Sequence, residues 1–367
     1  MQKFLKFDKK SNLIFIESYD EVRQCLFIIK KNLVLGNEVI VVVSSNNDLY
    51  RFITELNNKV FEKKIRLLFW SFPRNGKCNG GFGKKSFKHI QAIISEKRLL
   101  KKFYHNNLSN IVDAKVYFFT RYCNPYDYYF LKKLFKRNYL MLINVVDFKK
   151  YIYRYYPKNI WDIWRYCRLK FIYGAGMSLI QLPHGVYGYM PDGFIRRAVK
   201  KEIKVKEGER WLEGFSLDEF KVFNTQNFKI IYFDQPLVPK RVEKKEFKSK
   251  LNTIFHIILK YFKESDLGIK HHPEWKSDKS LFSVGNEIED FIPAEFLYDI
   301  NVKVYISFCS GAIVRIKKGI VISLLDLMAF RNEREKVELK ERLIQRANSR
   351  ILFPQTMADF ENILKNI

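Results

Sequence analysis

The sequence has few cysteines, and they are not arranged in pairs. The five residues are Cys25, Cys78, Cys123, Cys167 and Cys309, and no CxxC spacing occurs. A disulfide framework draws on an even set of cysteines, and a structural zinc site draws on clustered ligands. We therefore predict neither feature, and the pattern is typical of a protein from a reducing compartment.

Long apolar runs are also missing. No stretch of about 18 uncharged apolar residues occurs, and the start MQKFLKFDKK has no apolar segment followed by a small-residue cleavage site. We expect neither a membrane span nor an export signal. The prediction is a cytoplasmic protein whose contact with the anionic inner face of the cell membrane is at most peripheral.

Acidic residues are scarce relative to basic ones. The chain has 66 Lys and Arg residues against 39 Asp and Glu, which gives a formal net charge of +27 at pH 7. Such a field attracts nucleic acid, anionic lipid or anionic small molecules, although an AT-rich genome would also enrich surface lysine. Because the basic residues are scattered and no RRM, helix-turn-helix or zinc-finger pattern occurs, we predict that nucleic acid is not the partner.

Strand-like and helix-like segments alternate along the first half of the chain. With 367 residues the chain exceeds one usual hydrophobic core, which favours two domains. Residues 13–56 predict the order β-α-β-α, and short apolar runs follow at 65–70, 115–120, 139–145 and 178–182. We predict an open, mostly parallel sheet covered by helices, in an N-terminal domain over residues 1–223.

The alternation restarts near residue 224. The run FKIIYFDQP predicts a strand that ends in a turn, and we assign no chemistry to Asp234 in that turn. A helix and the strand-like runs LGIK, VKVYISF and GIVISLL follow. We predict a second domain over 224–345 and a C-terminal segment, 346–367, that packs back on the N-terminal domain. The fold class is α/β, with two Rossmann-like, doubly wound domains that face a central cleft.

The residues suited to chemistry concentrate between positions 268 and 313. The strand LGIK leads into His271–Pro273, and the strand VKVYISF leads into Ser310 and Gly311. Ligands bind at the carboxyl ends of parallel strands in such folds, and hydrogen-bond donors near a helix N-terminus suit a phosphate. Glu295 carries a carboxylate that can accept hydrogen bonds from the two hydroxyls of a ribose. The pattern predicts a nucleotide site.

The order KHHP, then PAE, then SFCSGA resembles the carboxyl-terminal half of bacterial sialyltransferases and polysialyltransferases of the GT-B fold. In those families an HP motif and a serine pair contact the phosphate of a CMP-linked acidic sugar, and a Glu holds its ribose. The resemblance implies that His272 and Pro273 match the HP motif. It also implies that Glu295 matches the ribose carboxylate and that Ser310 matches the first serine.

One position departs from the family pattern. Gly311 stands where the second serine would be, so a backbone N–H group, or Ser307 further up the strand, would have to replace that hydroxyl. The resemblance covers about half of the chain, mainly 176–195 and 226–325. The donor-nucleotide set that it implies is His271, His272, Pro273, Glu295, Ser307, Ser310 and Gly311.

A second departure concerns the catalytic base. The families carry an acidic motif after a strand of the first domain, whose carboxylate deprotonates the acceptor hydroxyl. In this chain SLIQLPHGVYGY places Pro183-His184-Gly185 there. Because an imidazole serves as a general base near neutral pH, we take His184 as the base, with Asp192 as the alternative. His272 would stabilise the leaving phosphate.

The predicted function is transfer of a sialic-acid-like sugar, a nonulosonate or Kdo, from CMP to a hydroxyl of a cell-surface glycan or glycolipid precursor. No DxD pair is placed to hold a metal-bound diphosphate, so neither a metal nor another cofactor is expected. Two alternatives stay open. One is a transferase that uses a UDP- or GDP-hexose or CDP-glycerol in capsule, lipopolysaccharide or teichoic-acid synthesis. The other is a non-catalytic basic protein that binds nucleic acid or membranes.

Overall fold

The chain divides into two compact units, Met1–Phe215 and Ser216–Ile367. The boundary thus precedes the predicted one at residues 223 and 224.

None of the helices in the described part of the chain has the length and hydropathy that a bilayer crossing needs. The structure, a computed structural model, describes residues 11–44, 46–71, 85–119, 129–130, 133–134, 137–144, 177–181, 187–191, 206–207, 212, 215, 217–220, 228–235, 242–272, 284–298, 302–316, 318–347 and 350–367.

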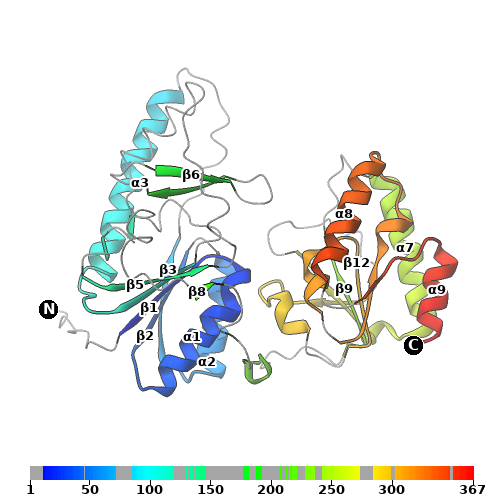
Figure 1. The fold of residues 1–367 in the computed structure, drawn as a ribbon, viewed down its shortest axis with the longest axis horizontal. Helices are drawn as coiled ribbons and strands as arrows, with labels where there is room; N and C mark the ends of the chain where they lie inside the picture. The colour runs from blue at the N-terminus through cyan, green and yellow to red at the C-terminus, as the bar shows by residue number, and fades with distance from the viewer. Residues whose placement is uncertain are drawn as a thin grey trace. The chain divides into compact units, whose positions relative to one another are not determined.

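The first unit contains a six-stranded parallel sheet (Figure 1). Its strands lie in the order β3-β2-β1-β4-β5-β8, and each neighbouring pair is parallel. Counted within the sheet, this is the strand order 3-2-1-4-5-6 of a Rossmann fold. The strands are β1 (Asn12–Ile16), β2 (Val39–Ser44), β3 (Ile65–Trp70), β4 (Lys115–Phe119), β5 (Tyr139–Asn144) and β8 (Lys206–Glu207).

Helices cover this sheet. Strands β1 and β2 are buried along their whole length, as expected of parallel strands covered on both faces. The side chain of Asn46 caps α2 by accepting a hydrogen bond from the Leu49 N–H at 2.9 Å. The ring of Phe103 on α3 lies 4.8 Å from that of Trp70 on β3. The elements are η1 (Tyr19–Glu21), α1 (Val22–Val34), α2 (Asn47–Lys59) and α3 (Lys85–Asn107).

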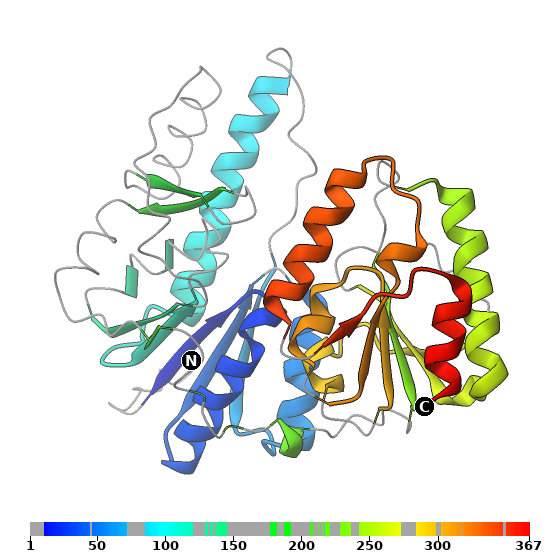
Figure 2. The same cartoon turned by 45° about the vertical axis from the view of Figure 1, so that its right-hand side comes forward.

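The strand predicted at 178–182 exists, but it does not belong to the parallel sheet. It is β6 (Met177–Gln181), which pairs with β7 (Tyr187–Pro191) in a separate antiparallel two-stranded sheet (Figure 2). Gln181 pairs with Tyr187 and Met177 pairs with Pro191. An apolar run identifies a strand but not its partner, which explains why the sequence did not reveal this arrangement.

The second unit repeats the architecture of the first. Its six strands lie in the order β11-β10-β9-β12-β13-β14, with each neighbouring pair parallel, which is again 3-2-1-4-5-6. These strand orders confirm the predicted fold class, an α/β protein with two Rossmann-like, doubly wound domains. The strands are β9 (Ile230–Phe233), β10 (Leu267–Lys270), β11 (Asn286–Ile288), β12 (Val304–Ser307), β13 (Ile320–Ser323) and β14 (Ile351–Leu352).

Helices and 3-10 segments connect these strands. Gly268 on β10 has no room for a side chain, because an added Cβ would lie 2.7 Å from a ring carbon of Phe228. Gly319 enters β13 with a φ of +87°, a conformation that favours glycine. The helices are α7 (Lys244–Tyr261), α8 (Glu333–Arg346) and α9 (Met357–Lys365), with 3-10 segments η4 (Asp218–Phe220), η5 (Glu264–Asp266), η7 (Ala294–Leu297), η8 (Gly311–Arg315) and η9 (Leu324–Leu327).

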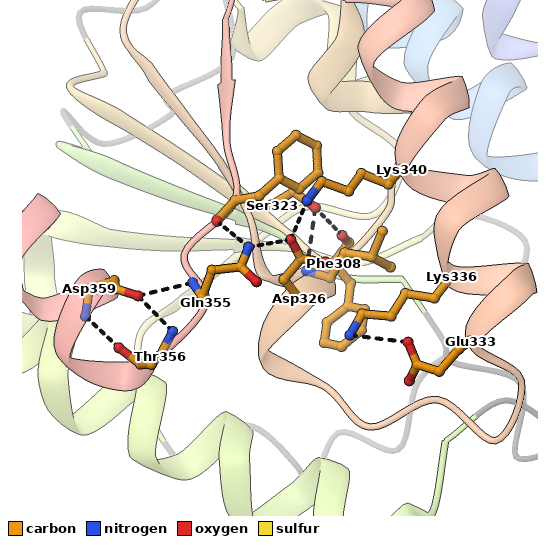
Figure 3. Close-up of polar contacts among 11 residues, drawn as sticks. Phe308, Ser323, Asp326, Glu333, Lys336, Lys340, Gln355, Thr356 and Asp359 are labelled. Atoms are coloured by element: carbon orange, nitrogen blue, oxygen red, sulfur yellow. Dashed lines mark hydrogen bonds and ion pairs between the residues drawn. The ribbon is translucent and has the colours of Figure 1, made fainter.

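The C-terminal segment is part of the second unit. We expected 346–367 to pack on the N-terminal domain, but β14 extends the second sheet beside β13. Lys260 of α7 forms an ion pair with Glu361 of α9 at 2.9 Å. Figure 3 shows Lys340 of α8 and Gln355, which precedes α9, both reaching Asp326 of η9, at 2.5 and 2.6 Å. This clamp, made of Asp326, Lys340 and Gln355, ties the tail to the sheet.

We expect Asp326→Ala to destabilise the second unit by about 2–4 kcal/mol. The Asp326 carboxylate is 8% exposed, and hydrogen bonds to a charged group contribute roughly 1.5–3 kcal/mol each. Urea unfolding, together with hydrogen exchange over residues 351–365, would measure the loss. Glu333→Ala is the matched control, because Glu333 is 69% exposed and 3.8 Å from Lys336, and such pairs contribute about 0–1 kcal/mol. Equal losses in both variants would contradict a role for the clamp.

Candidate functional site

Buried polar side chains of the second unit gather at one edge of its sheet. Among the described residues of this unit, every buried polar or charged side chain lies in the last residue of a strand or in the loop just after it. Parallel strands end at a common edge, and burying polar groups is costly unless they are hydrogen-bonded. This carboxyl edge is the candidate site. The side chains are Asp234, Lys270, His271, Ser307, Ser310 and Ser323.

The strand order places a switch point within this edge. β9 lies between β10 and β12, so the chain leaves the centre of the sheet first on one side and later on the other. Ligands of doubly wound sheets bind where the strand order reverses in this way. Asp234 follows β9, and the loop 308–310 follows β12, so both lie at the switch point.

Asp234 and His271 form a buried pair across the ends of β9 and β10. The carboxylate oxygen Oδ2 of Asp234 lies 3.0 Å from Nδ1 of His271, and the two residues are 3% and 4% exposed. The other ring nitrogen, Nε2, lies 3.8 Å from a carboxylate oxygen of Glu287 on β11. A carboxylate at Nδ1 fixes the orientation of an imidazole. We had assigned Asp234 to a turn without chemistry, whereas the structure gives it a contact with a predicted site residue.

The signal that would have identified Asp234 is local. A carboxylate directly after the buried strand IIYF needs a hydrogen-bond partner, and the histidines that follow the next strand are residues of a type that can provide one.

Burial, and then the neighbouring Asp234 and Cys309, raise the pKa of Tyr232 well above its usual range. The phenol of Tyr232 therefore stays neutral beside the pair.

The loop after β10 separates the two histidines. Lys270 is buried, and its ammonium donates to the backbone carbonyls of His271 and Asp290 at 3.1 and 3.0 Å. These bonds hold the backbone at the end of β10. His271 is buried, whereas His272 is partly exposed, so His272 is the more accessible of the two. Pro273 lies outside the described residues.

Three serines organise the loop after β12. The hydroxyl of Ser307 donates to the carbonyl of Phe233 at 2.9 Å and accepts from the N–H of Ser310 at 3.2 Å. The hydroxyl of Ser323 donates to the carbonyl of Phe308 at 2.6 Å. Since Ser307 is fully buried and bonded on both sides, it positions the loop. The predicted phosphate contact of Ser307, the alternative to a backbone N–H group, stays a prediction.

Ser310 and Gly311 begin η8 at the same loop. The Ser310 hydroxyl accepts from the Ala312 N–H at 3.2 Å, as an N-cap does. An accepted bond leaves the hydroxyl hydrogen available for a second partner. Gly311 is exposed, and a Cβ added there would meet nothing within 4 Å. Open space therefore lies beside the loop, next to a hydroxyl and exposed backbone.

Glu295 lies on a neighbouring element. It is part of η7, which begins after Pro293 and follows β11, and η7 packs against η8. The hydroxyl of Tyr305 on β12 holds the end of η7 by donating to the Leu297 and Tyr298 carbonyls, both at 3.1 Å. The structure thus brings the backbone of Glu295 close to the element that Ser310 caps. The Glu295 side chain lies outside what is described.

The switch point of the first unit is built differently. There the carboxylate of Glu21 accepts the backbone N–H groups of Glu17 and Ser18, just after β1, at 2.8 and 3.1 Å. Glu21 is 2% exposed. Backbone N–H groups after the first strand are the donors that bind a phosphate in Rossmann folds. In the first unit the protein's own carboxylate occupies two of them.

In sequence, one candidate base lies between strands β6 and β7 and the other directly follows β7. His184 belongs to the connection after Gln181, and Asp192 follows Pro191. Both lie outside the described residues, so their roles remain predictions. Among the residues that are described, no group of three or more His, Cys, Asp and Glu side chains is placed to hold a metal ion. The predicted metal independence remains a prediction as well.

Comparisons with known proteins give weak similarities only. No protein-family model matches the chain, and no curated protein sequence matches it. Among solved structures, UGT89C1 of Arabidopsis thaliana complexed with UDP is 10% identical, with 86% of this chain and 80% of that chain covered and a TM-score of 0.37. UGT73P12 of Glycyrrhiza uralensis, complexed with glycyrrhetinic acid 3-O-monoglucuronide, is 10% identical, with coverages of 94% and 81% and a TM-score of 0.40.

A third similar structure is UDP-N-acetylglucosamine 2-epimerase from Rickettsia bellii. It is 14% identical, with 97% of this chain and 87% of that chain covered and a TM-score of 0.40. At such low scores these similarities support no conclusion about this chain. The fold assignment rests on its own strand order and pairing.

Proposed function

We propose that the protein is a glycosyltransferase that takes its sugar from a nucleotide donor bound at the carboxyl edge of the second sheet. The observation that supports this most directly is the set of buried polar side chains at that edge, centred on the switch point between β9 and β12. Open space beside Gly311 leaves room for a ligand there. In the first unit, Glu21 occupies the equivalent N–H groups, which favours the second unit as the donor site.

The proposed donor is CMP linked to a sialic-acid-like sugar, a nonulosonate or Kdo. This choice rests on the resemblance of KHHP, PAE and SFCSGA to bacterial sialyltransferases. His272 and the hydroxyl of Ser310 would donate to the phosphate and stabilise it as it leaves. Glu295 would accept from the ribose hydroxyls. The buried His271 would support the loop that presents His272, since Asp234 holds its ring.

A UDP- or GDP-hexose or CDP-glycerol is the alternative donor. The same edge would accept the phosphate of any of these nucleotides, because the hydrogen-bond donors described there recognise the phosphate anion and not the base. The acceptor in either case is a hydroxyl of a cell-surface glycan or glycolipid precursor, deprotonated by His184 or Asp192. A lipid-linked acceptor would bring the protein to the anionic inner surface of the membrane, so peripheral membrane contact is part of the proposal.

Nucleotide binding tests the proposal directly. We expect one CMP per chain by isothermal titration calorimetry, because in the first unit Glu21 already occupies two of the N–H groups that would bind a phosphate. A nucleotide at about 100 times its dissociation constant adds roughly 2.7 kcal/mol of stability, so thermal shifts with CMP, UDP, GDP and CDP would rank the donors. A larger shift with UDP or GDP would replace CMP by the alternative donor.

Paired histidine variants give the control. His272→Ala should weaken nucleotide binding about tenfold, the loss of one charge-assisted contact of roughly 1.4 kcal/mol. His256→Ala, at an exposed position on α7, should leave it unchanged. Absence of binding by any nucleotide, together with salt-dependent binding to duplex DNA, would support the non-catalytic basic protein instead.

A further inference from the structure

The excess positive charge belongs almost entirely to the first unit. Residues 1–215 contain 41 Lys and Arg and 18 Asp and Glu, a net charge of +23, whereas residues 216–367 contain 25 and 21, a net charge of +4. Compositional drift toward lysine would raise the charge of both units. The asymmetry therefore points to an anionic partner of the first unit.

Three exposed basic side chains of the first unit lie on one face of helix α3. Arg98, Lys101 and Lys102 of α3 are exposed, and residues three and four positions apart lie on the same side of a helix. The opposite side carries the buried Leu100 and Tyr104. We call Arg98, Lys101 and Lys102 the α3 basic face.

This charge is not compensated by the acidic residues described. The ion pairs described in the first unit are Lys59–Glu55 and Lys64–Glu62, and neither involves the α3 basic face. Other lysines do form ion pairs, as Lys229, Lys250, Lys260 and Lys340 of the second unit do with carboxylates at 2.5 to 3.1 Å. The α3 basic face is therefore free to interact with external anions.

Exposed apolar side chains accompany these charges. Ile94, one helical turn before Arg98, and Leu99 are each 40% exposed. A soluble anionic polymer would gain little from apolar neighbours, whereas a bilayer surface offers phosphate head groups and acyl chains together. Basic residues next to exposed aliphatic ones match a lipid surface better than a nucleic acid, which rewards aromatic stacking.

We propose that the α3 basic face docks the first unit on an anionic phospholipid surface. Arg98, Lys101 and Lys102 bind head-group phosphates, and Ile94 and Leu99 rest at the edge of the acyl layer. The inference deepens the peripheral contact in the proposed function by naming the surface that makes it. Its test measures membrane binding without turnover, so it can fail while the donor site stands.

The test is vesicle cosedimentation of the full chain. Phosphatidylcholine vesicles that contain about 30% of the anionic lipid phosphatidylglycerol should bind the protein, and pure phosphatidylcholine vesicles should not. The variant Arg98→Gln/Lys101→Gln/Lys102→Gln should bind on the order of 100-fold more weakly, since each basic residue near such a surface contributes about fivefold. The matched control is Lys245→Gln/Lys248→Gln/Lys365→Gln, which removes three exposed lysines of the second unit and should lower binding less than fivefold.

Binding of CMP measured on the same variants separates this inference from the proposed donor site. Intact nucleotide affinity with lost vesicle binding supports docking through α3. Equal loss in both triple variants would mean that only net charge matters, which overturns the assignment to α3. Tight binding to a soluble polyanion without any vesicle binding would also overturn it, in favour of a polymeric anionic ligand.

Discussion

Alanine at the acceptor base is expected to lower the rate of sugar transfer by about 10²–10⁴-fold, the usual contribution of a positioned general base. We expect this loss for only one of the two candidates, His184 and Asp192. The register of the β6–β7 ribbon is the reason. Gln181 pairs with Tyr187 and Met177 pairs with Pro191, so the chain enters the His184 connection at one end and leaves toward Asp192 at the other. Four residue steps of strand separate those ends by about 13 Å.

Because the ribbon ends that lead to the two residues are about 13 Å apart, we expect one of the two groups, and not both, to reach the acceptor hydroxyl. His184→Ala and Asp192→Ala therefore serve as controls for each other. Single-turnover release of nucleotide from the donor, with saturating acceptor, would measure the step. CMP affinity should stay within twofold of the parent in the affected variant, because the base touches the acceptor and not the donor. Equal losses in both variants, or no loss in either, would contradict the assignment of a base to this region.

The second large effect is expected at the buried pair. Asp234→Asn should lower kcat/KM for the donor by about 100-fold, the upper end of what a residue that orients a site group contributes. The Asp234 carboxylate accepts from Nδ1 of His271 at 3.0 Å inside the protein. An amide can turn its NH₂ group toward the same nitrogen, so the ring would change its tautomer or its orientation. The adjacent His272 would then lose its position.

The matched control is Glu287→Gln. Glu287 lies 3.8 Å from the other ring nitrogen of His271 but is 53% exposed, so solvent screens the contact and we expect less than about a threefold change. Steady-state kinetics and urea unfolding should be measured together, because a lost hydrogen bond to a charged group also costs about 1.5–3 kcal/mol of stability. A loss of stability with unchanged donor kinetics would limit Asp234 to a structural role.

Much of the fold could be predicted from local patterns. The strands at LIFI, VIVVV and IIYF are unbroken apolar runs, and each is a buried strand of a parallel sheet. The charged tail forms helices α8 and α9 with the short strand β14 between them. These signals are local because burial on both faces and helical periodicity are written into consecutive residues.

The candidate site was predictable only in part. Parallel strands end at one edge, so the sequence indicated that the segments after β10 and β12 would share that edge, and they do. Which side chain faces the interior was not indicated. Neighbouring residues at a strand end differ in exposure, and so His271 is buried while His272 is partly exposed. Ser307 is likewise bonded inward, to Phe233.

By itself the sequence determined where the longer apolar strands and the amphipathic helices lie, that two α/β units follow each other, and which residues stand at those strand ends. It did not predict β7, β8 and β11. Only the tertiary structure decided the strand order 3-2-1-4-5-6, the antiparallel pairing of β6 with β7, the place of the tail in the second sheet and the contact between Asp234 and His271. The physical reason is distance along the chain. Periodicity and burial act between neighbours in sequence, whereas strand partners and buried hydrogen bonds join residues that only the folded chain brings together.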